Sequence, residues 1–95
     1  MNNFDAHVLV VDDDHGIRSL VGQYLTENNF LITTAKSSED AGEKIALIKF
    51  DLIVLDIMMP GKNGLEFIQE HKDKINTPII LLTAKNEVNE RVEGL

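Results

Sequence analysis

The chain has 95 residues, of which 43% are hydrophobic and 26% are charged, a composition that fits one small globular domain and argues against wholesale disorder. Its formal net charge of -7 disfavours direct binding to nucleic acids or to anionic membrane surfaces, and the lack of cysteine excludes disulfides and thiolate metal sites. No apolar run reaches the roughly 20 residues of a membrane span, and MNNFDAH does not resemble a signal peptide. We therefore expect a cytoplasmic protein.

The first third of the chain alternates between two kinds of pattern. Residues 7–11 (HVLVV) and 30–34 (FLITT) are short apolar runs that predict buried strands. Between them, apolar residues recur at helical spacing and predict an amphipathic helix over about residues 15–28. The apolar face of this helix comprises Ile17, Leu20, Val21, Tyr24 and Leu25.

The same alternation continues to the last residue. Ser37 and Asp40 have the spacing of a capping box, which predicts a helix that runs to about residue 49 with Ile45 and Ile48 facing inward. Further strands are expected over 51–55 (DLIVL) and 78–82 (PIILL), with a helix over about 64–71 between them and a last helix capped by Asn86.

Four strand and helix pairs with short connections predict an α/β domain with a parallel sheet. In such sheets ligands bind beyond the carboxyl ends of the strands. Asp12, Asp13 and Asp14 follow the first strand, Asp56 follows the third, and Thr83 follows the fourth. We expect these side chains to meet at one edge of the sheet.

Carboxylates that lie this close repel one another unless a cation compensates their charge. Oxygen ligands of this kind suit Mg²⁺, which prefers an octahedral shell that includes several waters. An alternative for each residue remains open, because Asp and Thr at strand ends also cap helices or form turns, and capping is the favoured role of Asp14. Asp56 ends an apolar strand ahead of the turn at residues 60–64, where a carboxylate beside a cation could attack phosphorus.

Three segments together resemble the signature blocks of bacterial two-component response-regulator receivers: VLVVDDDHGIR, DLIVLDIMMPGKNGLE and PIILLTAK. The resemblance implies a flavodoxin-like, doubly wound parallel sheet with strand order 2-1-3-4-5. It implies that Asp56 is the phosphoacceptor and that Asp13 and Asp56 ligate Mg²⁺, with Asp12 acting through water and Met58 through its backbone carbonyl. Thr83 matches the switch hydroxyl.

The resemblance also implies partners. A sensor histidine kinase would donate the phosphoryl group, docking on exposed residues near Ile17 and Leu20, and the response would be regulated transcription through an output domain. Such a domain is not an enzyme beyond catalysing its own phosphorylation and slow dephosphorylation. The fifth strand and fifth helix of a complete receiver would fall beyond Leu95, so we expect residues 1–95 to form a truncated receiver whose fourth strand is an open sheet edge. That edge would favour a homodimer or a strand-swapped dimer.

Two other functions remain open. The chain could be a phosphorylation-independent binding module that titrates a kinase or a partner receiver. It could also be a flavin- or nucleotide-binding enzyme on the same fold, although GKNG at residues 61–64 does not form a phosphate-binding loop. His7, His15 and His71 are expected to be surface or loop residues.

Overall fold

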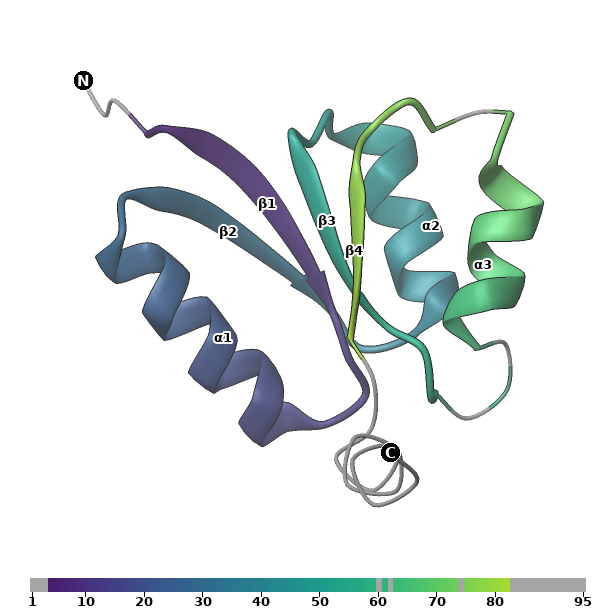
Figure 1. Ribbon diagram of the computed structural model, residues 1–95, viewed down its shortest axis with the longest axis horizontal. Helices are drawn as coiled ribbons and strands as arrows, with labels where there is room; N and C mark the ends of the chain where they lie inside the picture. Colours follow the sequence, from purple (N-terminus) through teal and green to yellow (C-terminus); the bar gives the residue numbers. More distant parts are fainter. Residues whose placement is uncertain (1–3, 60, 62, 74, 83–95) are drawn as a thin grey trace, which may run out of the picture.

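The computed structural model describes residues 4–59, 61, 63–73 and 75–82 of the chain. Its strands form one parallel sheet in the order β2-β1-β3-β4, with α1 on one face and α2 and α3 on the other (Figure 1). This arrangement confirms the predicted α/β fold. The elements are β1 (Ala6–Val11), α1 (His15–Glu27), β2 (Phe30–Ala35), α2 (Ser38–Leu47), β3 (Leu52–Asp56), α3 (Gly64–His71) and β4 (Ile79–Leu82).

The central strands are apolar on both faces because helices cover both. On β1, Leu9 and Val11 pack with Ile53 and Leu55 of β3 and with Phe67 of α3. The larger of two buried clusters thus lies between the sheet and the pair α2 and α3, where Ile45 and Ile48 pack against it as expected. Alternate residues of the same strands point to the other face, where the smaller cluster comprises Val8, Val10 and Val54.

Helix α1 covers the second face less completely than its apolar stripe predicts. Val21 and Leu25 pack against the smaller cluster. Leu20 and Tyr24, however, are each 66% exposed, so these two residues of the apolar face lie in solvent. A helix that lies on a flat sheet buries only a narrow strip, and side chains at the border of the apolar stripe stay in solvent.

The predicted capping box of α2 is only half formed. The Ser37 side chain accepts a hydrogen bond from the Asp40 amide at 3.0 Å, as expected for an N-cap. The Asp40 carboxylate reaches past Ser37 and accepts from the Lys36 amide instead, at 3.2 Å. The helix ends at Leu47, two residues earlier than predicted, because Ile48 has an extended backbone. A complete capping box occurs at α3, between Asn63 and Glu66.

Two of the three histidines are not simple surface residues. His7 lies on β1, where its Nε2 is 2.7 Å from the Thr33 hydroxyl and its ring packs edge-on against Phe50. The His71 ring stacks on Phe67 with ring centres 4.4 Å apart. Both rings therefore take part in packing, a role that the prediction of surface or loop residues did not include.

Strand β4 is an edge of the sheet within the described residues, and its Ile80 is 51% exposed. Pairing of this edge with another chain stays a prediction. The helix predicted after Asn86 lies outside the described residues, and so does Thr83. Among the helices that the structure describes, none combines the length and apolarity needed to cross a membrane.

Candidate functional site

The parallel register of β1 and β3 brings three carboxylates together. Val11 lies opposite Leu55, so Asp12 and Asp56 occupy the next positions on two adjacent strands. Each of the residues Asp12, Asp13 and Asp56 offers a carboxylate oxygen within 4.8 Å of the others. Asp12 is 5% exposed and Asp56 is 9% exposed, while Asp13 is open to solvent. The expected convergence of these residues at the carboxyl edge is confirmed.

Asp14 has the capping role that was favoured for it. Its carboxylate accepts a hydrogen bond from the Ile17 amide at 3.1 Å and so caps α1. The Asp14 amide in turn donates to the Asp12 carboxylate at 2.9 Å. The three consecutive acids therefore divide into one helix cap and two members of the carboxylate cluster.

The loop after β3 is folded tightly around Asp56. The Met58 amide donates to the Asp56 carboxylate at 3.0 Å, and the Gly64 amide donates to the Ile57 carbonyl at 3.0 Å. A Cβ atom added to Gly64 would lie 2.6 Å from the Asp56 carbonyl oxygen, closer than Cβ atoms approach other atoms in proteins. Only glycine therefore allows α3 to begin so close to the end of β3.

The electrostatics of the cluster favour a proton or a cation. The pKa of Asp56 is raised to about 6, mainly by burial; the hydrogen bond from the Met58 amide opposes this rise, and the nearby Asp12 and Asp13 contribute to it. Burial is also the main reason that the pKa of Asp12 is raised. In the part of the chain that the structure describes, no lysine or arginine forms an ion pair with these carboxylates. Among the described residues, their charge is therefore not neutralised by a basic side chain.

The donor set fits a hard divalent cation. All three side chains offer oxygen, and one of them is open to solvent, as suits Mg²⁺, which keeps part of its water shell. The structure thus supports an oxygen-ligated cation site at the predicted residues. The Met58 carbonyl as a further ligand stays a prediction, and Thr83 lies outside the described residues.

Two residues at the edge of this cluster were missed by the sequence interpretation. Arg18 of α1 donates from its guanidinium to the Asp12 carbonyl at 2.7 Å. Gly64 lies so close to the Asp56 backbone that no side chain fits there. The arginine looks like an ordinary polar residue of an amphipathic helix, and its contact with the loop depends on how α1 turns back onto β1. The glycine could have been noticed as the last residue of the turn at residues 60–64.

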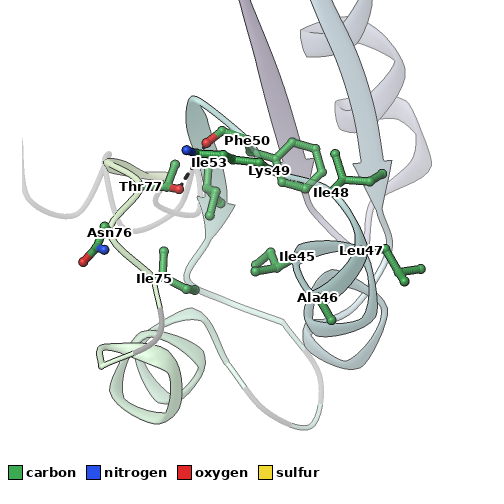
Figure 2. A pocket seen from close by; sticks show the side chains of 10 residues that line it. All are labelled: Ile45, Ala46, Leu47, Ile48, Lys49, Phe50, Ile53, Ile75, Asn76 and Thr77. Carbon is green, nitrogen blue, oxygen red and sulfur yellow. Dashed lines mark hydrogen bonds between the residues drawn. The ribbon is translucent and has the colours of Figure 1, made fainter.

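A pocket of about 410 Å³ lies at the opposite end of the sheet. Figure 2 shows it between the end of α2 and the segment before β4, where Thr77 donates a hydrogen bond to the Phe50 carbonyl. Its lining is mainly apolar and includes Ile45, Ile53 and Ile75. With no acidic group among its lining residues, this pocket lacks the chemistry of the carboxyl edge.

Comparison with known proteins identifies the family. The family model of the response regulator receiver domain matches residues 8–95. The chain belongs to this family. Residues 1–95 are 46% identical to protein PetR of Rhodobacter capsulatus, and 90 residues are 43% identical to transcriptional regulatory protein ResD of Bacillus subtilis. These matches cover 100% and 95% of the chain but only 40% of PetR and 38% of ResD.

Solved receiver structures agree with this fold. The receiver domain of Francisella response regulator 1452 superposes with a TM-score of 0.80 at 34% identity, over 95% of this chain and 75% of that one. Response regulator TrrA from Thermotoga maritima, in complex with Mg²⁺ and BeF, superposes with a TM-score of 0.78 at 40% identity, over 93% of this chain and 77% of that one. The chain therefore has the flavodoxin-like receiver fold. Because a receiver is a signalling domain, family membership favours a signalling role over that of a nucleotide-binding enzyme.

Proposed function

We propose that this receiver domain accepts a phosphoryl group on Asp56 from the phosphohistidine of a sensor histidine kinase. One observation carries the proposal. In a member of the receiver family, the carboxylates of Asp12, Asp13 and Asp56 lie together at the carboxyl edge of the sheet, with oxygen atoms within 4.8 Å of one another. Nothing else in the described part of the chain gathers acidic groups in this way.

The chemistry is a transfer between two nucleophiles. A carboxylate oxygen of Asp56 attacks phosphorus, a new O–P bond forms, and the P–N bond to the kinase imidazole breaks. The leaving imidazole takes up a proton from solvent. Asp56 must be ionised to attack, which its raised pKa of about 6 permits at neutral pH. The amide of Met58 holds one Asp56 oxygen at 3.0 Å and so orients the carboxylate.

We assign Mg²⁺ to the same cluster, with Asp13 and Asp56 as direct ligands, Asp12 acting through water and Met58 through its carbonyl. When bound, the ion neutralises charge on the phosphoryl oxygens. The TrrA complex with Mg²⁺ and BeF supports this assignment, because beryllofluoride is a tetrahedral mimic of a phosphoryl group and TrrA is 40% identical to this chain. Thr83 is proposed as the hydroxyl that hydrogen-bonds the bound phosphoryl group.

The role of the whole protein is a broader proposal. ResD is a transcriptional regulatory protein, and we infer that this receiver also regulates transcription, in the cytoplasm, through an output domain. The chain spans 40% or less of the length of PetR and ResD, so this inference rests on their likeness over the receiver alone. We assign residues 1–95 to the receiver.

The proposal is tested by phosphorylation of the chain with radiolabelled acetyl phosphate and MgCl₂. We expect an acid-stable, base-labile label on the wild-type chain, none on Asp56→Asn, and none when EDTA replaces MgCl₂. Glu43→Gln, which removes an exposed carboxylate of α2 away from the cluster, is the matched control and should be labelled like wild type.

Two results would contradict the proposal. The first is the absence of label on a folded wild-type chain under conditions that label TrrA. The second is a label that persists on Asp56→Asn, which would show that the phosphoryl group is attached elsewhere.

A further inference from the structure

The loop between β1 and α1 must hold two adjacent carboxylates against a third. Asp12 and Asp13 both belong to the cluster with Asp56, and mutual repulsion of the three groups favours a loop that spreads them apart. Before any cation is bound, other contacts of the loop must oppose this repulsion. The hydrogen bonds of Asp12 show what does so.

The Asp12 peptide is held at both ends. Its amide donates to the Ala35 carbonyl of β2 at 3.1 Å, and its carbonyl accepts from the Arg18 guanidinium of α1 at 2.7 Å. The first bond continues the pairing of β1 with β2. The second is made by a charged side chain that reaches back from the first turn of α1, and charge-assisted hydrogen bonds of this kind are stronger than neutral ones.

Arg18 donates to a backbone carbonyl and not to a carboxylate, and this affects how a metal ion could bind. Arg18 donates to the backbone of Asp12 and, among the described residues, forms no ion pair with a carboxylate. A salt bridge to Asp12 or Asp13 would occupy oxygen atoms that a metal ion needs. By binding the carbonyl, Arg18 brings a positive charge to the loop and leaves the carboxylates available.

From these contacts we infer that Arg18 is a positioning residue: it holds the β1–α1 loop in the shape that presents Asp12 and Asp13 to a divalent cation. This inference rests on the proposed function, since it concerns Mg²⁺ binding at the same cluster. It makes Arg18 part of the support of the site, comparable to the outer groups that orient metal ligands in other proteins.

A simpler role for Arg18 makes the opposite prediction. If the arginine mattered only through its charge, removing it would make the cluster more negative, and Mg²⁺ would bind more tightly. If it positions the loop, removing it weakens Mg²⁺ binding although the cluster has become more negative. The sign of the change in affinity therefore separates the two roles.

The experiment measures the Mg²⁺ dissociation constant by isothermal titration calorimetry for the wild-type chain, Arg18→Met, Arg18→Lys and Lys36→Met. We expect Arg18→Met to weaken binding by about 10-fold, within the range for residues that orient metal ligands, and Arg18→Lys, which keeps a cationic donor, to weaken it less. Lys36→Met removes the same charge from an exposed residue that follows β2 at the same sheet edge, and should not weaken binding.

A second measurement covers the case in which Arg18→Met does not fold. In the wild-type chain, an NMR signal of the Arg18 guanidinium should be protected from exchange with solvent, before and after Mg²⁺ is added. Rapid exchange, or an Arg18→Met variant that binds Mg²⁺ as tightly as wild type, would overturn the inference. If the wild-type chain and Arg18→Met bind Mg²⁺ equally, only the role of Arg18 fails, whereas a wild-type chain that binds no Mg²⁺ contradicts the proposed function itself.

Discussion

Asp12 and Asp56 lie side by side at the ends of β1 and β3, one position beyond the paired residues Val11 and Leu55. Both carboxyl groups are buried, and each influences the other's charge. We expect this neighbourhood to make the stability of the domain depend on pH and on divalent cations.

In EDTA, Asp56 should make the domain less stable as the pH rises. Its pKa is raised from 3.8 to about 6 by burial and by neighbouring carboxylates, so the folded state binds a proton more tightly than the unfolded state. As the pH rises through this interval, the unfolded state loses its proton first and the free energy of unfolding falls. Asp56→Asn should therefore be more stable than wild type by about 1 to 3 kcal/mol at about pH 7, with little difference at about pH 3.

The measurement is thermal unfolding of both proteins in EDTA across this pH range. Glu43→Gln is a control, since Glu43 is an exposed carboxylate of α2 away from the cluster. If the melting temperatures of wild type and Asp56→Asn change with pH in the same way, burial of the Asp56 charge has no cost in the folded state.

Mg²⁺ should stabilise the wild-type domain, which in EDTA is expected to be less stable than Asp56→Asn. A cation that binds the folded state alone stabilises it by an amount that grows with the logarithm of its concentration. We expect added MgCl₂ to raise the melting temperature of wild type and to have a much smaller effect on Asp13→Asn. Because Asp13 is exposed, its loss should leave the fold intact in EDTA. Equal Mg²⁺ responses of wild type and Asp13→Asn would remove Asp13 from the ligand set.

Gly64→Ala and Gly22→Ala should change stability in opposite directions. A methyl group at Gly64 would lie 2.6 Å from the Asp56 carbonyl oxygen, which forces the loop or α3 to shift and should cost about 1 to 3 kcal/mol. At Gly22 in α1, the nearest atom beyond the helix backbone is 3.7 Å from the Cβ position, an ordinary contact. There alanine should stabilise the helix by up to about 1 kcal/mol.

Urea unfolding of the two variants checks this contrast. Gly64→Ala should also slow labelling by acetyl phosphate, because the shifted loop carries the Met58 amide that orients Asp56. A Gly64→Ala variant with wild-type stability and labelling would contradict the account of the close approach.

Kinase docking should depend on the exposed apolar residues of α1. Leu20 is 66% exposed on that helix, whereas Leu47 is 85% exposed at the end of α2, on the other face of the sheet. We expect Leu20→Gln to slow phosphotransfer from a histidine kinase that phosphorylates wild type, while labelling by acetyl phosphate stays unchanged. Leu47→Gln should affect neither rate. If the two variants behave alike with the kinase, α1 is not the docking surface.

Much of the fold could be predicted from local patterns. The short apolar runs became the four strands within a residue at each end, since a strand covered by helices on both faces must be apolar throughout. Ser37 and Asp14 were recognisable as caps because an N-cap bonds an amide only three residues away. The alternation of strands and helices was enough to place Asp12, Asp13 and Asp56 at one edge.

Other features could not be read from local patterns. The exposure of Leu20 and Tyr24 depends on the angle at which α1 lies on the sheet, and the packing of His7 against Phe50 depends on how the segment before β3 meets β1. Each of these is set by contacts between elements.

The sequence by itself therefore determined that Asp12, Asp13 and Asp56 gather at one edge of the sheet, because alternating strands and helices predict a parallel sheet whose strands all end at the same edge. Only the tertiary structure decided how the cluster is held. The register that places Asp12 beside Asp56, the reach of Arg18 back to the Asp12 carbonyl and the approach of Gly64 to Asp56 all join segments whose separation in space is fixed by packing. These contacts form only when the helices have packed on the sheet.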